Sequence, residues 1–226
     1  MKFTYLGHSC FLLETKGKTI LFDPFISGNP LAKDVDKDKI DCDYIFVSHG
    51  HQDHILDLVD IAKRTGALVV GSWELGSYLE ENGVKKHHTM NNGGSFNFDI
   101  GEVYMTTAVH SNSFQGRYLG TAAGFVIKND EHCFYYAGDT ALTMDMKLFA
   151  LRYNIQTAVL PIGGNFTMDY KDACIASDFI ECEQIIGVHY NTFPPIKLDK
   201  DKALKHFEDA GKSLQLLKIN EVKELN

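Results

Sequence analysis

Arginine is scarce in this chain of 226 residues. Only Arg64, Arg117 and Arg152 are arginines among 22 basic residues, and the formal net charge is −8. Proteins that bind nucleic acids in general present a basic face rich in Arg and Lys. The composition therefore predicts an acidic surface and no nucleic-acid partner.

Paired cysteines and long hydrophobic runs are also missing. The five cysteines form no C-x-x-C pair and their number is odd, which is typical of free thiols in a reducing compartment. No run of about 18 apolar residues predicts a membrane span, and no secretory signal pattern opens the chain. We therefore expect a cytoplasmic protein.

Linkers, repeats and low-complexity tracts are absent too, so we expect one domain over residues 1–226. Short apolar runs alternate with amphipathic segments, and tight turns join several runs as hairpins. Strands are predicted at 2–6, 10–14, 19–22, 44–48, 67–70, 86–90, 95–98, 103–109, 121–128, 133–137, 158–161 and 185–188. Helices are predicted from residue 55 to Gly66, at 74–81, 146–153 and 171–179, and before Gly211.

These elements predict an α/β fold, a four-layer αββα sandwich in which two mixed β-sheets are flanked by helices. A doubly wound parallel sheet is the alternative, but the hairpins favour mixed sheets. Residues 25–42 lack a clean hydrophobic period and are expected to form a loop that could fold over a site, and residues 111–120 are expected to form a second loop.

One stretch after the apolar run 44–47 combines three histidines with an aspartate. Imidazoles suit Zn, Fe, Ni and Cu, and carboxylates extend the range to Mn and Mg. His49 and His51 project to the same side of an extended segment, whereas Asp53 and His54 turn back from a helix start. A zinc site takes three or four ligands, so a loop this rich predicts two adjacent ions.

Further candidate ligands follow the ends of other predicted strands. Asp23, His110, Asp139 and His189 each come directly after an apolar run. Folds of the α/β class build sites from residues at strand ends along one rim of a sheet. We therefore expect these side chains to converge with the histidine-rich loop.

The order of these residues resembles that of the metallo-β-lactamase superfamily: H-x-H-x-D-H, a single His, an Asp within 137–140 and a final His, each after a strand. Residues 6–11 and 189–194 are similar to a small bacterial metal-dependent hydrolase branch, itself similar to ascorbate-6-phosphate lactonase and N-acylphosphatidylethanolamine phospholipase D. Residues 165–168 also resemble this branch, although Asp169 stands where the branch usually has Gly.

The resemblance implies a dinuclear metal centre. Asp23 would accept a hydrogen bond from a ligand imidazole and fix its orientation. The number of histidines favours zinc, with Mn or Fe as alternatives because carboxylates add oxygen ligands. The implied ligands are His49, His51 and His110 for one ion, Asp53, His54 and His189 for the other, and Asp139 as a bridge between them.

The expected reaction is hydrolysis by a hydroxide that bridges the two metals, since metal ions lower the pKa of bound water to near neutrality. Two divalent ions outweigh two carboxylates and a hydroxide, so the positive pocket favours a small anionic ester, lactone or phosphodiester. Asp53, Asp139 and His8 are the expected catalytic residues. A homo-oligomer would fit the branch.

Residues near the implied centre are candidates for substrate contact or proton delivery. For His8 the alternative is a structural histidine in a tight turn, and for Tyr190 and Asn191 it is support of the ligand loop. Asn165 is the fourth candidate. Arg117 could bind an anion, but solvent exposure is favoured.

Four histidines are not expected to bind metal. His87 and His88 are neighbours on a predicted strand and point to opposite faces. His132 lies beside a turn, and His206 lies on the charged side of the last helix.

Other functions fit the sequence less well. A nuclease of the tRNA 3′-processing type would need a clamping segment or a basic stripe. Flavodiiron proteins have Glu where His51 stands, and β-lactamases of the superfamily typically have Cys where Asp139 stands. A metal-binding protein without hydrolytic activity is the remaining alternative, and the complete set of candidate ligands argues against it.

Overall fold

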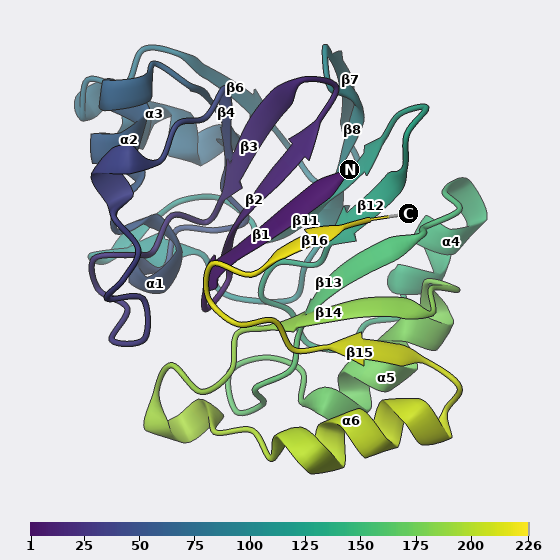
Figure 1. Ribbon diagram of the computed structural model, residues 1–226. Coiled ribbons are helices and arrows are strands. Elements are labelled where there is room, and N and C mark those ends of the chain that lie inside the picture. Colours follow the sequence, from purple (N-terminus) through teal and green to yellow (C-terminus); the bar gives the residue numbers. More distant parts are fainter. Residues whose placement is uncertain (226) are drawn as a thin grey trace.

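Two seven-stranded sheets lie face to face in the computed structural model, which describes residues 1–225 (Figure 1). The first sheet is antiparallel from β16 to β3 and parallel from β3 to β6. Its strands, in spatial order, are β16 (Val222–Glu224), β1 (Lys2–Gly7), β2 (Cys10–Thr15), β3 (Lys18–Phe22), β4 (Tyr44–Phe46), β5 (Leu68–Ser72) and β6 (His87–Met90).

The second sheet is also mixed, with its parallel part running from β12 to β15. Its strands, in spatial order, are β15 (Ser213–Gln215), β14 (Gln184–Val188), β13 (Thr157–Pro161), β12 (Cys133–Tyr136), β11 (Ala123–Lys128), β8 (Gly101–Thr107) and β7 (Ser95–Phe98). The strands β9 (Ser113–Phe114) and β10 (Arg117–Tyr118) form a separate hairpin.

Helices cover the outer faces of both sheets (Figure 1). The helices over the first sheet are α1 (Gln52–Ile55), α2 (Leu58–Thr65) and α3 (Trp73–Glu81), and those over the second sheet are α4 (Met146–Arg152), α5 (Tyr170–Phe179) and α6 (Lys200–Asp209). Two short 3-10 helices are η1 (Lys37–Lys39) and η2 (Pro194–Ile196). The predicted αββα sandwich of two mixed sheets is confirmed.

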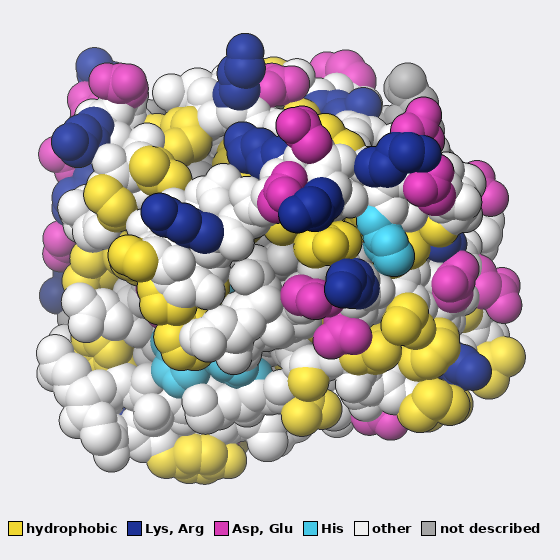
Figure 2. Space-filling model, turned by 90° about the horizontal axis from the view of Figure 1, so that it is seen from below, with side chains coloured by type: hydrophobic (Ala, Val, Ile, Leu, Met, Phe, Trp, Pro, Cys, Tyr) yellow, Lys and Arg dark blue, Asp and Glu magenta, His cyan; other side chains and the backbone are white. Residues whose placement is uncertain are grey.

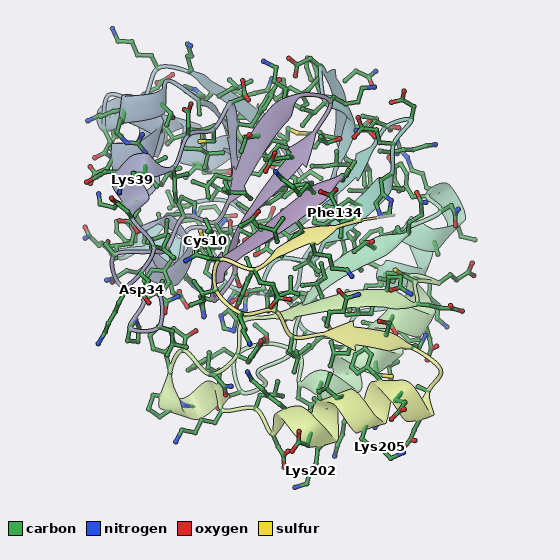
Figure 3. The ribbon with its side chains drawn as sticks, in the orientation of Figure 1. Cys10, Asp34, Lys39, Phe134, Lys202 and Lys205 are labelled. Atoms are coloured by element: carbon green, nitrogen blue, oxygen red, sulfur yellow. The ribbon has the colours of Figure 1, made fainter. Side chains whose placement is uncertain are left out.

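Hydrophobic residues divide between three cores according to strand alternation. On β2, Phe11 joins the core between the sheets, whereas Cys10 faces the helices over the first sheet. On β12, Phe134 and Tyr136 face the first sheet and Tyr135 faces the helices. Figure 3 shows Phe134 between the two sheets. Strands buried on both faces explain why the sequence shows apolar runs and not polar–apolar alternation.

The helix predicted to start at residue 55 is wrong in one respect: the structure has α1 and α2 with a break between them. Asp57 sits at the break, and its carboxylate accepts hydrogen bonds from the backbone N–H groups of Ile26 and Ser27 at 2.7 and 2.9 Å. Through Asp57, the segment between α1 and α2 therefore holds the start of the 25–42 loop beside the histidine-rich loop. The hydrophobic periodicity of one segment does not reveal a contact with a distant segment.

Several strand assignments also differ from the predictions. The predicted loop 111–120 contains the β9–β10 hairpin, and the C-terminal strands β15 and β16 were not predicted. β8 ends at Thr107, so Val109 lies outside the sheet. Within residues 1–225, no helix has the length and hydrophobicity to cross a bilayer.

Candidate metal centre

The histidine-rich loop begins after the carboxyl end of β4, an inner strand of the first sheet, and leads into α1. Gly50 sits at its tightest point: a Cβ atom there would lie 2.3 Å from Leu119 Cδ1. The Gly50 N–H donates to Asn112 Oδ1 at 2.7 Å. The close approach of Leu119 and the bond to Asn112 explain why a glycine separates His49 from His51.

Three imidazole nitrogens converge on one side of this loop. His51 Nδ1 lies 3.0 Å from His49 Nε2 and 3.2 Å from His110 Nε2. Ligand nitrogens of a tetrahedral zinc ion, at 2.0–2.1 Å from the metal, are about 3.3 Å apart. The three histidines therefore fit one ion, and the structure brings together the residues predicted for the first site.

The residues predicted for the second site also lie together, with one addition. Asp53, His54 and His189 place ligand atoms within 4.8 Å of one another, and His8 joins the same group. His54 Nε2 and His189 Nε2 are buried and have no hydrogen-bond partner among residues 1–225. A buried nitrogen without a partner is costly unless it binds something, so this donor set fits a metal ion.

Asp139 lies between the two groups. Its Oδ2 is 3.9 Å from His49 Nε2 and 3.6 Å from His110 Nε2 on one side. On the other side the same oxygen is 3.4 Å from His54 Nε2 and 3.0 Å from His189 Nε2. Asp139 Oδ1 is buried without a hydrogen-bond partner in the described chain. One carboxylate therefore reaches both groups, as a bridging ligand must.

The electrostatics around Asp139 favour positive charge on His54 and His189, whereas the pKa values of His49, His51 and His110 are lowered, chiefly by burial. Burial acts to lower the pKa of His189, but the Asp139 carboxylate outweighs it and raises that pKa to about 9. The pKa of His54 is likewise raised, by Asp139 and Asp23, against the effect of burial. Burial would raise the pKa of Asp139, but His189 and His54 hold it well below its usual value. Without metal, these protons occupy the place that cations would fill.

Asp23, predicted to orient a ligand, is fully buried at the end of β3. Its Oδ2 accepts from His54 Nδ1 at 2.8 Å and from the Tyr136 hydroxyl at 2.6 Å, and its Oδ1 accepts from the Ser48 N–H at 2.7 Å. These bonds direct His54 Nε2 towards Asp139. Tyr136 belongs to the other sheet, so this residue was missed by sequence analysis.

His8 contacts Asp53 and not open solvent. Its Nε2 lies 3.1 Å from Asp53 Oδ2, and its Nδ1 lies 2.9 Å from Thr192 Oγ1. A carboxylate only accepts, so Nε2 carries the proton and the Thr192 hydroxyl donates to Nδ1. Burial lowers the pKa of His8 to about 4. These contacts favour a role in orienting Asp53, and catalysis by His8 stays a prediction.

The three predicted substrate residues lie in different surroundings. Asn165 is exposed in the loop after β13, so it is free to meet a substrate. Tyr190 is buried against the helices over the second sheet, and burial raises its pKa to about 12. Asn191 Oδ1 accepts from the Leu198 N–H at 2.8 Å. The contacts of Tyr190 and Asn191 favour support of the loop, and substrate binding by all three stays a prediction.

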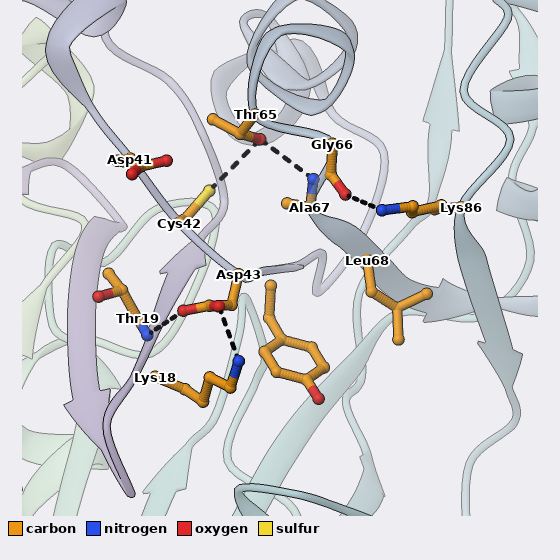
Figure 4. A pocket seen from close by; sticks show the side chains of 11 residues that line it. Lys18, Thr19, Asp41, Cys42, Asp43, Thr65, Gly66, Ala67, Leu68 and Lys86 are labelled. Atoms are coloured by element: carbon orange, nitrogen blue, oxygen red, sulfur yellow. Dashed lines mark hydrogen bonds and ion pairs between the residues drawn. The ribbon is translucent and has the colours of Figure 1, made fainter.

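Arg117, and His132 as expected, have partners away from the centre. Arg117 pairs with Glu81 on α3, and His132 Nε2 contacts Thr157 Oγ1 at 2.9 Å. A cavity of about 450 Å³ lies at the opposite ends of β3 and β4 (Figure 4). There Asp43 binds Lys18 and the Thr19 N–H. Two of its charged groups, Asp43 and Lys18, are thus paired with each other, and Lys86 donates to the Gly66 carbonyl.

Comparison with known proteins agrees with this geometry. The pattern of a β-lactamase superfamily domain matches residues 2–189. The chain belongs to the metallo-β-lactamase superfamily, as the order of its ligands predicted.

Similar proteins identify the branch. The chain is 49% identical to a UPF0173 metal-dependent hydrolase of Flavobacterium johnsoniae, with both chains covered in full, and 50% identical to one of Christiangramia forsetii, also in full. A solved structure, the metallo hydrolase Igni18 of Ignicoccus hospitalis, has a TM-score of 0.90 and 33% identity, covering 100% of this chain and 99% of that one. The predicted metal-dependent hydrolase branch is confirmed, and the chain is a metal-dependent hydrolase of this superfamily.

Proposed function

We propose that the chain is a dinuclear hydrolase of a small anionic ester, lactone or phosphodiester. The position of Asp139 carries this proposal, because one carboxylate oxygen lies 3.0–3.9 Å from a histidine nitrogen of each ligand group. Two divalent ions, zinc by default and manganese or iron as alternatives, would supply a water of near-neutral pKa and polarise the reacting oxygen.

The protein residues have separate tasks in this proposal. His49, His51 and His110 would hold one ion, and Asp53 with His189 would complete the other site beside His54. Asp23 keeps His54 in place through the bond to Nδ1, while His8 restrains Asp53. The exposed face of Asp53 leaves room for substrate, since its side chain is 29% exposed.

Turnover by the metal-loaded protein tests the proposal. A chromogenic phosphodiester and a sugar-phosphate lactone serve as substrates for wild type, Asp139→Asn and an exposed control, Asp201→Asn. We expect turnover of at least one substrate, lost by more than about 100-fold in Asp139→Asn, because even changes outside the ligand set cost 10–100-fold. Asp201→Asn should match wild type. Equal turnover in Asp139→Asn and wild type would overturn the proposal.

A further inference from the structure

Four hydrophobic residues that are not candidate ligands lie on or beside the loops that carry the candidate metal ligands. Leu56 follows His54 by two residues and is 36% exposed, and Val109 precedes His110 and is 52% exposed. Phe166 is 56% exposed, and Phe193 is partly buried with its ring 5.5 Å from the His8 ring. We call Leu56, Val109, Phe166 and Phe193 the rim.

Hydrogen bonds place these residues at the centre from different sides. The Val109 N–H donates to Thr140 Oγ1 at 3.0 Å, directly after Asp139. Phe166 lies in a loop whose Met168 N–H donates to the Thr140 carbonyl at 3.0 Å. The other end of that loop touches the ligand His189, because a Cβ atom on Gly163 would lie 2.2 Å from the His189 carbonyl oxygen.

Leu56 and Phe193, the other two rim residues, pack around Phe25. Its ring lies 5.6 Å from that of His8 and 6.3 Å from that of Phe193. A Cβ atom on Gly28 would lie 2.6 Å from both Leu56 Cδ2 and Phe25 Cε2, so the two side chains enclose that turn. Leu56 and Phe193 are therefore held by the 25–42 loop, which Asp57 anchors.

Charged side chains lie away from one group of histidines on the surface of the molecule. Figure 2 shows histidine side chains at the lower left of the face, bordered by hydrophobic and uncharged polar surface, with Lys, Arg, Asp and Glu farther away. Two basic side chains of the nearby loops form ion pairs with helix carboxylates: Lys37 pairs with Asp60 at 3.1 Å, and Arg117 pairs with Glu81. None of the four rim side chains is charged, so a second anionic group on a substrate, such as a remote phosphate, would gain no ion pair from the rim itself.

We propose that the rim binds an apolar alkyl, acyl or aryl group joined to the bond that is hydrolysed. The proposal rests on the proposed function in that the reacting group lies at the metal centre, and a substrate that carries a negative charge carries it at this group. Substrates would thus be monoanionic or neutral esters with a hydrophobic body, and not sugar phosphates.

Binding of a homologous series of alkylphosphonates, from methyl to hexyl, tests the rim without requiring turnover. Calorimetry on the metal-loaded full chain should show affinity rising up to about four-fold per methylene until the rim is covered. The ratio of hexyl to methyl affinity should fall at least about three-fold in Phe166→Ser. It should stay at the wild-type value in Leu151→Ser, a control 84% exposed on α4.

Turnover of p-nitrophenyl acetate, butyrate, hexanoate and the succinate half-ester separates the two proposals. Higher kcat/KM for hexanoate than for the acetate and half-ester supports the rim. Chain-length-dependent phosphonate binding without any ester or phosphodiester turnover would retain the rim and contradict the hydrolytic function. Affinity independent of chain length, as expected if a second copy of the chain covered the rim, or preference for the half-ester would overturn the rim.

Discussion

The Tyr136 hydroxyl links the second sheet to the carboxylate that orients His54. Removing it in Tyr136→Phe leaves Asp23 Oδ2 with fewer donors and frees the His54 ring to turn. We expect the affinity for the metal beside His54 to fall about 10–100-fold, as for other changes behind metal ligands. Competition with a chromophoric chelator and the visible spectrum of the Co²⁺-loaded protein measure this effect.

Tyr44→Phe is a matched control, because Tyr44 also donates to an aspartate, Asp99, but at the far end of β4. Both variants should lose comparable stability, about 1–2 kcal/mol. Only Tyr136→Phe should alter metal affinity and the Co²⁺ spectrum. Equal metal affinity in the two variants would show that the hydroxyl of Tyr136 has no part in positioning His54.

Metal binding should release protons from the site. The pKa of His189 is raised to about 9 and that of His54 is also raised in the metal-free protein, so both carry protons at pH 7. Metals displace these protons, and apparent affinity should therefore rise with pH until about pH 9. Calorimetry in buffers of different ionisation enthalpy should show net proton release at pH 7. Release of none would contradict this charge state.

The stability of the metal-free protein should depend on pH in the opposite direction to metal affinity. A raised folded-state pKa for His189 stabilises the metal-free protein below its unfolded-state value near 6.5. That contribution is lost as pH rises through about 9. The metal-free protein should accordingly lose stability over the range in which metal affinity increases.

At the scale of elements, the turn at Gly50 determines how the first ligand pair is presented. Gly50→Ala places a methyl group against Leu119 and should destabilise the fold by about 1–3 kcal/mol. A double-mutant cycle with Leu119→Ala should show a favourable coupling energy of about 0.5 kcal/mol or more, since the smaller side chain relieves the overlap. Urea unfolding measures all four proteins, and strictly additive effects would contradict the overlap.

Many of the strand positions could be predicted, and the seven candidate ligands could be proposed from the family resemblance, because apolar runs and the ligand motif are local patterns. Buried strands appear as apolar runs, and polar residues directly after them, such as His110 and Asp139, must lie at a sheet edge. Contacts between distant segments leave no such pattern. The bond from Tyr136 to Asp23 and that from Thr192 to His8 join residues 113 and 184 positions apart, and neither was predicted.

At the scale of the whole molecule, the metal centre joins the two sheets. The histidine-rich loop belongs to the first sheet, whereas His110, Asp139 and His189 follow strands of the second. Metal at 1,000 times its Kd should stabilise the folded state by about 4 kcal/mol, equivalent to roughly 8–16 °C in Tm for a chain of this size. Calorimetric scans with and without EDTA should show this shift, and bound metal with an unchanged Tm would contradict it.

Anomalous diffraction from a zinc-loaded crystal tests the central claim most directly, because it counts the ions and locates their ligands. We predict two peaks about 3.5–4 Å apart, one beside His49, His51 and His110 and the other beside Asp53, His54 and His189, with Asp139 between them. A single peak in the fully loaded protein, or two peaks that share no ligand, would contradict the dinuclear account.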